Sequence, residues 1–132
     1  MSSYLLIALG SALGGMARHW CTVTLANRLG ASFPWGTLLV NVVGSFLIGL
    51  VAALTLPDGR SGETQTAREF LMVGLLGGYT TFSAFSLQTL TLLRDGKLAY
   101  AGANVAVSVA VCLIAVWLGY VLGNVLKSAP SL

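Results

Sequence analysis

Hydroxyl side chains and aromatic rings stand close together in the stretch GLLGGYTTFSAFS, residues 74–86, which lies inside a long apolar run. Phe82 and Phe85 are three residues apart, so they share one face of a helix. Because the edge of a phenyl ring carries partial positive charge, ring edges turned into a pore can contact an anion. The hydroxyls of Thr81, Ser83 and Ser86 need polar partners in hydrocarbon. The stretch therefore has the groups to escort an anion, although packing or lipid contact is the ordinary role of such phenylalanines.

Two further sets of neutral hydrogen-bonding side chains recur every four residues, so each set forms a line along one helix face. The first set is Thr37, Asn41 and Ser45, and the second is Tyr100, Asn104 and Ser108. Inside a membrane such a line either joins helices by hydrogen bonds or borders a wet path. Taken with the hydroxyls of residues 80–86, the two lines favour a wet path.

The placement of the charges favours an anion over a cation on such a path. A proton-coupled pump for organic cations needs a carboxylate within the membrane. Arg18 lies well inside the first apolar run, where a cation beside neutral donors suits an anion, unless its side chain snorkels to the interface. We assign no role to the adjacent His19. All four acidic residues lie in connectors or at the ends of apolar runs: Asp58, Glu63, Glu69 and Asp95.

Four long apolar segments must position these side chains. They cover roughly residues 4–26, 35–56, 70–92 and 98–126, and each reaches the ~20 residues that a membrane helix needs. The chain has 132 residues, 56% of them hydrophobic and 8% charged, against about 25% charged in a typical soluble domain. Short connectors make successive helices antiparallel neighbours. We therefore expect a single all-α transmembrane domain over residues 1–132.

Glycines predict two features of this bundle. Gly77-Gly78 predicts a break near the middle of the third span, because glycine destabilises a helix interior by about 1 kcal/mol relative to alanine. Carbonyls freed by a break must face protein, water or an ion, and Thr80 and Thr81 can cap the resumed helix. The alternative is that the glycines serve close packing alone. Small residues four apart, which allow close helix approach, are Gly10/Gly14, Ser45/Gly49, Gly74/Gly78 and Gly119/Gly123.

The basic residues do not choose an orientation in the membrane. Cytoplasmic loops normally carry an excess of Lys and Arg. Arg28, Arg94 and Lys97 lie on the side opposite the N-terminus, and Arg60, Arg68 and Lys127 lie on the N-terminal side. Either this signal is weak in a chain with few charges, or the chain inserts both ways and pairs antiparallel, which we expect. Four helices are also few for a pore, so self-association is expected.

Other functional classes lack their residues. The net charge of +3 comes from scattered basic residues, so we expect no nucleic-acid partner. Cys21 and Cys112 lie in apolar runs and are expected to act as small buried hydrophobes. With one His, no cluster of metal-ligating side chains and no nucleophile paired with a base, an enzyme is not expected.

The sequence resembles the Fluc (CrcB) family of fluoride channels over essentially its whole length. The resemblance is carried by GGYTTFSAFS at 77–86, PWGTLLVNVVGSFLIG at 34–49 and GGMAR at 14–18, and the first of these with Asn41 is the specific part. It implies a passive fluoride-selective channel in a bacterial inner membrane, built as an antiparallel, dual-topology homodimer with two pores. It also implies a structural sodium ion on the dimer axis.

The resemblance also implies roles for single residues. The ring edges of Phe82 and Phe85 would face fluoride, and the carbonyls of Gly77 and Thr80 match those that hold the sodium ion. Two positions depart from the family pattern: Ala84, where threonine is common, and Asn104, where a small hydroxyl residue is usual. With the polar lines included, the expected fluoride pore is lined by Phe82, Phe85, Asn41, Thr37, Thr81, Ser83, Tyr100, Asn104, Ser108 and Arg18.

Two other functions stay open from the residues themselves. A small multidrug-type transporter is also a dual-topology protein of four spans, but this sequence lacks the carboxylate within the membrane that it needs. A non-conducting membrane scaffold would use the polar lines only to join helices. For a fluoride channel the physical demand is a narrow lining of closely placed donors, since pore radius and donor placement exclude larger anions.

Overall fold

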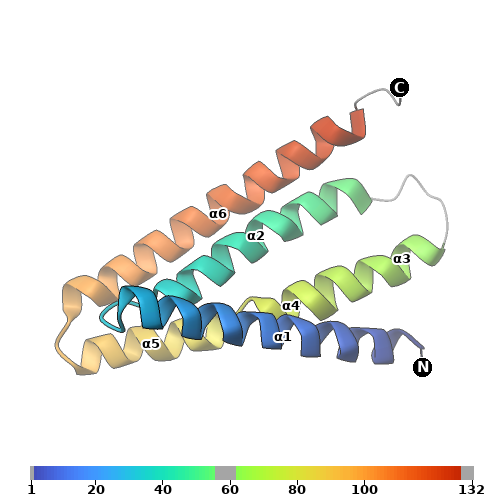
Figure 1. Ribbon diagram of the computed structural model, residues 1–132. Helices are drawn as coiled ribbons and strands as arrows, with labels where there is room; N and C mark the ends of the chain where they lie inside the picture. Colours follow the sequence, from blue (N-terminus) through green and yellow to red (C-terminus); the bar gives the residue numbers. More distant parts are fainter. Residues whose placement is uncertain (1, 56–61, 129–132) are drawn as a thin grey trace.

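The computed structural model describes residues 2–55 and 62–128, and all regular structure in these two ranges is helical. The all-α prediction is therefore confirmed for the described residues. Helical segments follow one another as four long stretches, the third of them interrupted (Figure 1). They are α1 (Ser2–Leu29), α2 (Trp35–Thr55), α3 (Gly62–Arg68) with the π-helix η1 (Glu69–Leu76) and α4 (Gly77–Tyr79), α5 (Phe82–Arg94), and α6 (Leu98–Ser128).

Three of the described helical stretches are long and apolar enough to cross a membrane: Trp35–Thr55, Gln65–Arg94 and Leu98–Ser128. The expected first span, α1, matches them in length with 28 residues, which is about 42 Å of helix. It is less apolar than the others because Arg18 and His19 interrupt its hydrophobic run. The expected spans agree with the helices to within a few residues, and the expected end of the second span, residue 56, lies outside the described residues.

Successive long stretches run antiparallel, as the short connectors predict. The start of α1 and the end of α6 lie at one end of the bundle, and the α1–α2 and α5–α6 connections lie at the other (Figure 1). Glycine makes both reversals, since Gly30 and Gly96 have φ of 81° and 74°, a region that other residues enter at a cost. The turn after α5 is closed by Lys97 N, which donates to Leu92 O at 2.9 Å.

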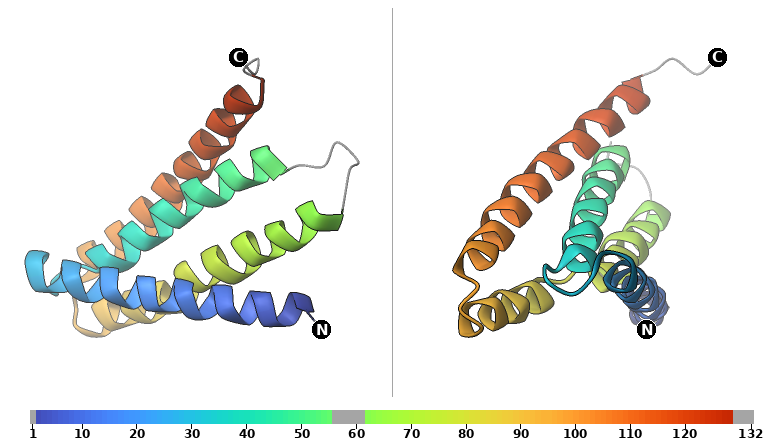
Figure 2. Two further views of the ribbon diagram at one scale, coloured as in Figure 1. Left: turned by 45° about the vertical axis from the view of Figure 1, so that its right-hand side comes forward. Right: turned by 60° about the vertical axis from the view of Figure 1, so that its left-hand side comes forward.

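The predicted close approach of α1 to the third stretch is confirmed, because small residues face backbone at each crossing. A Cβ on Gly14 would overlap the carbonyl oxygen of Leu75, and one on Gly78 would lie 2.6 Å from the carbonyl oxygen of Ser11. In Figure 2, α1 accordingly runs beside α3 and α4 in the left-hand view.

The second close pair is α2 with α6, which lie side by side along most of their lengths (Figure 2). A Cβ on Gly49 would overlap the carbonyl oxygen of Val116, and one on Gly119 would overlap that of Phe46. These backbone contacts are the arrangement that small residues four apart permit in a membrane. Each half of the bundle is thus locked by glycines, and the site lies between the halves.

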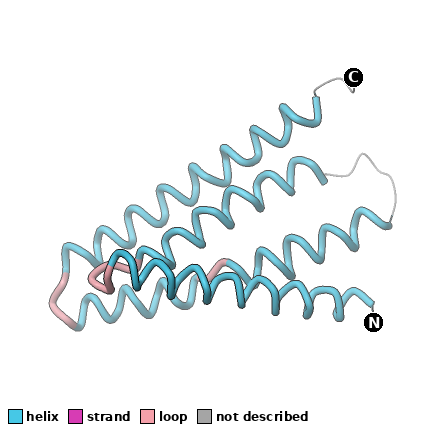
Figure 3. The backbone as a smooth tube through the Cα atoms, viewed as in Figure 1, coloured by secondary structure: helices cyan, strands magenta, loops and turns pink. Residues whose placement is uncertain are grey.

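The third stretch is broken as predicted, but the predicted position of the break was wrong. Gly77 and Gly78 remain helical in α4, and the chain leaves the helix at Thr80 and Thr81 (Figure 3). The physical reason is that Gly78 packs directly on α1, so the absent side chain is used for contact and the helix there is supported. The helix ends instead where a side chain from α2, Asn41, captures the main chain of Thr81.

Candidate ion-binding site at the helix break

Asn41 stabilises the break by pairing with the main chain of Thr81. Thr80 and Thr81 are extended, with φ, ψ of −81°, 159° and −154°, 120°. Thr81 N donates to Asn41 Oδ1 at 2.7 Å, and Asn41 Nδ2 donates to Thr81 O at 3.0 Å. The amide thus bonds both polar groups of one residue, as a neighbouring strand would. Backbone groups freed at membrane depth need such partners, so this pair makes the break stable.

Thr81 also starts the next helix, which confirms its predicted capping role. Its Oγ1 accepts from Ala84 N at 3.1 Å, the usual bond of a threonine N-cap. The same hydroxyl lies 3.2 Å from Ser83 Oγ. The first turn of α5, which carries both phenylalanines, is therefore fixed relative to Asn41 on α2.

Arg18 reaches the break from α1. Its Nη1 donates to Thr80 O at 3.3 Å, and both groups are partly buried. Thr80 Oγ1 donates to Leu76 O at 2.9 Å, which closes the last turn of α4. The guanidinium thus lies against the interrupted backbone, where it contributes positive charge to a region otherwise built of neutral groups.

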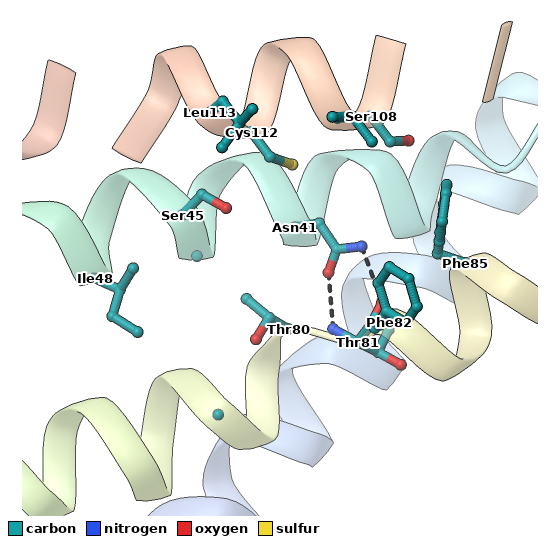
Figure 4. A pocket seen from close by; sticks show the side chains of 13 residues that line it. Asn41, Ser45, Ile48, Thr80, Thr81, Phe82, Phe85, Ser108, Cys112 and Leu113 are labelled. Carbon is teal, nitrogen blue, oxygen red and sulfur yellow. Dashed lines mark hydrogen bonds between the residues drawn. The ribbon is translucent and has the colours of Figure 1, made fainter. Parts of the chain in front are cut away.

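A cavity of about 580 Å³ opens beside the break, between α2, the α4–α5 junction and α6 (Figure 4). Its polar lining consists of amide, hydroxyl and backbone groups, and none of the described residues that line it is charged. Aromatic and aliphatic side chains complete the wall. The lining residues are Asn41, Gly44, Ser45, Ile48, Gly77, Thr80, Thr81, Phe82, Phe85, Ser108, Val109, Cys112 and Leu113.

The two phenylalanines form one aromatic unit at the mouth of this cavity. Their ring centroids are 5.3 Å apart and the ring planes are tilted by 45°. Phe85 is half-buried, whereas Phe82 is 77% exposed. A large ring so exposed beside a cavity lies at the open side of the site, where a second molecule can complete the wall.

The structure brings together five of the ten expected pore residues, with both of the expected sodium-binding residues beside them. Asn41, Thr81, Phe82, Phe85 and Ser108 all line the cavity. Gly77 and Thr80 line it as well. The i+4 line on α2 and the stretch after the break therefore converge in space, as the sequence predicts, although they are some 40 residues apart in the chain.

The other five expected pore residues lie outside the cavity lining. Thr37 is buried at a second cavity of about 240 Å³ near the α1–α2 connection. Tyr100 is 48% exposed, with its ring 6.3 Å from that of Phe33. Asn104 is 1% exposed and bonds to α5. Ser83 and Arg18 contact the break through Thr81 and Thr80.

Sequence reasoning missed two residues at these cavities. Gln88 lines the 240 Å³ cavity, and its Oε1 is buried without a hydrogen-bond partner in the part of the chain that the structure describes. Its position three residues after Phe85, on the same helix face, was the available signal. Gly44 lines the larger cavity, and a Cβ there would overlap Thr80 Cγ2. Nothing in the sequence distinguishes Gly44 from the other packing glycines.

A cation at the break would have to use backbone oxygens. The described residues contain no group of three or more His, Cys, Asp or Glu side chains that could hold a metal ion. In a continuing helix Thr81 N would donate to Gly77 O, but here it donates to Asn41 Oδ1. Thr80 O accepts from Arg18 Nη1 and retains a second lone pair. The donor set is therefore chemically suited to a hard cation, and one chain offers two such oxygens.

Comparison with known proteins agrees with this architecture. The family model described as "CrcB-like protein, Camphor Resistance (CrcB)" matches residues 5–120. A protein of Methylocella silvestris named "Fluoride-specific ion channel FluC" is 55% identical over 129 residues, covering 96% of this chain and 98% of its own length. The protein of the same name from Opitutus terrae is 58% identical over 121 residues, covering 92% of each chain.

The matched region contains every residue of the break and of the cavity beside it. A further relative with that name, from Rhodospirillum rubrum, is 55% identical over 119 residues, covering 90% of this chain and 92% of its own. Together with the apolar helices, these matches make the protein a multi-pass membrane protein. The chain belongs to the CrcB-like family.

Proposed function

We propose that this chain forms a fluoride-selective channel through which fluoride leaves a bacterial cell passively across the inner membrane. The observation that carries the proposal is the uncharged cavity at the break, where one asparagine, hydroxyl groups and two phenyl rings converge. The relatives named as fluoride-specific ion channels support the same ion. The family is one of ion channels, which is not a class of enzyme.

The lining suits a small anion that must lose its water. Asn41 Nδ2 uses one hydrogen on Thr81 O, which leaves its second hydrogen as a donor. The edges of Phe82 and Phe85 offer partial positive charge. Arg18 adds positive potential beside Thr80 without lining the cavity. Neutral donors hold fluoride less tightly than a cation in the pore would, so the ion can also leave.

The functional unit in this proposal is an antiparallel, dual-topology homodimer with two pores. The support is the exposure of Phe82 and the open side of the cavity, which a second chain would close. A sodium ion on the dimer axis would be held by the carbonyls of Gly77 and Thr80 from both chains. Its role is structural: the ion would offset the partial negative charge of these oxygens and join the two breaks.

Efflux from liposomes tests the proposal directly. Vesicles that contain the purified protein and are loaded with potassium fluoride should release fluoride, as read by a fluoride electrode, whereas chloride-loaded vesicles should retain chloride. Equal leakage of both ions would overturn fluoride selectivity. Drug-dependent proton flux would instead favour a multidrug-type transporter. The absence of flux, with a partner protein co-purifying in fixed proportion, would favour a scaffold.

The ring-edge role of Phe82 has its own test. We expect Phe82→Ile to abolish fluoride efflux while the dimer survives, because isoleucine fills part of the space but has no positive ring edge. The matched control is Leu87→Ile, since Leu87 is 65% exposed on the same helix and does not line the cavity. Fluoride efflux of Phe82→Ile at the rate of the control would refute the role of the ring.

A further inference from the structure

Asn104 lies where a line of polar residues along α6 would place it in the pore, yet its side chain is fully used inside the protein. It is 1% exposed and is, with Val40, one of the two largest fully buried side chains among the described residues. Asn104 Nδ2 donates to Thr89 Oγ1 at 2.9 Å. Its Oδ1 accepts from Ser108 Oγ at 3.4 Å. Asn104 therefore joins α5 to the cavity-lining face of α6 without lining the cavity itself.

The hydrogen bond to Thr89 continues to the backbone of a pore phenylalanine. Thr89 Oγ1 accepts from Asn104 and donates to Phe85 O at 2.8 Å. Hydrogen bonds in such a chain polarise one another in a low dielectric. The side chain of Asn104 thus acts on Phe85 through a single intervening hydroxyl.

The helix that carries the two phenylalanines has few other anchors. Of the residues of α5, all of which the structure describes, Leu92 alone is buried. The N-terminus of α5 is held by the pairing of Asn41 with Thr81, and its C-terminus is held by the turn closed at Lys97. Between these ends apolar packing is sparse, so a polar bond at Thr89 has a large share in fixing the helix.

We infer that Asn104 is a positioning residue for fluoride conduction, acting through Thr89 on Phe85 and directly on the Ser108 hydroxyl. While Ser108 donates to Asn104 Oδ1, its proton points away from the cavity. The bond is long, so the hydroxyl can turn to donate to a passing anion and then return. This inference rests on the proposed function. It places Asn104 behind the conduction path, in contrast to the role expected from the resemblance.

Substitution of Thr89 tests the inference without touching a residue of the cavity. Thr89→Val keeps the shape of the side chain but removes the hydroxyl that receives Asn104 Nδ2, and Thr89→Ser restores it. We expect Thr89→Val to lower the rate of fluoride efflux about tenfold, the scale of one buried hydrogen bond, and to lower the ratio of fluoride to chloride efflux. Thr89→Ser should conduct as the unmodified protein does.

The matched control is Thr91→Val, the same chemical change two residues further along α5. Thr91 is exposed, and its Oγ1 donates to Leu87 O of its own helix. Size-exclusion chromatography and thermal unfolding would confirm that all variants are folded. A Thr89→Val protein with the rate and selectivity of Thr91→Val would overturn the positioning role. Failure of the unmodified protein and of Thr91→Val to conduct fluoride would instead overturn the proposed function.

Discussion

At the scale of single residues, the site depends on amides that bond backbone or buried hydroxyls rather than each other. Asn41 could be recognised from the sequence because it lies in a polar line with Thr37 and Ser45. The same spacing rule also selected Asn104, and the structure places the two amides in different surroundings. Spacing fixes the helix face but not what the neighbouring helix presents there. Thr89, the partner of Asn104, belongs to no such line.

The clearest prediction at this scale concerns Asn41. Asn41→Asp keeps the acceptor for Thr81 N but sets a carboxylate oxygen against Thr81 O, where the amide had donated. We expect a loss of about 1–3 kcal/mol in stability, the cost of an unsatisfied buried polar group. We also expect a strong fall in fluoride efflux, because the new charge repels the anion. Thermal unfolding and liposome efflux measure the two effects separately.

The control for that substitution is Asn124→Asp on α6. Asn124 makes one exposed hydrogen bond, from Nδ2 to Tyr120 O at 3.1 Å, and it does not line the cavity. The same change in charge should there leave efflux near the unmodified rate. If Asn41→Asp conducted fluoride as Asn124→Asp does, Asn41 would not border the path.

At the scale of elements, the sequence predicts the helices, their order and the existence of a break, since long apolar runs and short connectors determine these. It does not predict where the break falls. Glycine propensity pointed to Gly77-Gly78, but tertiary contact with α1 overrides propensity there, and the end of the helix is determined by Asn41 from a distant segment. The π-helical turn of η1 likewise has no signal in local composition.

Helix packing supplies the prediction at this scale. Gly14→Ala would place a methyl group against the carbonyl of Leu75 and 2.8 Å from Tyr79 N, so α1 must move away from η1 and α4. Overpacking of this kind destabilises by about 1–3 kcal/mol. Because Arg18 on the same helix bonds Thr80 O, we also expect fluoride efflux to fall. The measurements are thermal unfolding in detergent and liposome efflux.

The neighbouring glycine is a matched control for Gly14. A Cβ on Gly15 would meet nothing within 4 Å, and alanine favours a helix by up to about 1 kcal/mol relative to glycine. Gly15→Ala should therefore be as stable as the unmodified protein or slightly more stable, with unchanged efflux. Equal stability of the two alanine variants would show that α1 does not need its close contact with the third stretch.

At the scale of the whole molecule, one chain presents an open cavity with an exposed Phe82 at its mouth. The bundle places Arg28, Arg94 and Lys97 at one end, and Arg68 and Lys127 at the other, while Arg60 lies outside the described residues. This near balance could be counted from the sequence, since it needs only the order of spans. The identity of the surface that closes the cavity could not, because it depends on side chains brought together by folding.

Biasing the orientation tests whether that surface is an oppositely inserted copy. Asn27→Lys with Ala31→Lys adds charge at the α1–α2 end, and Gln65→Lys with Ser128→Lys adds it at the other; all four sites are exposed. Since added Lys near short loops directs insertion, each variant alone should insert one way. Neither should then conduct fluoride by itself, and co-expression of both should restore efflux, because antiparallel pairs can form again. Full efflux from either variant alone, with one orientation verified by labelling of its C-terminus, would mean that the pore forms between parallel chains or within one chain.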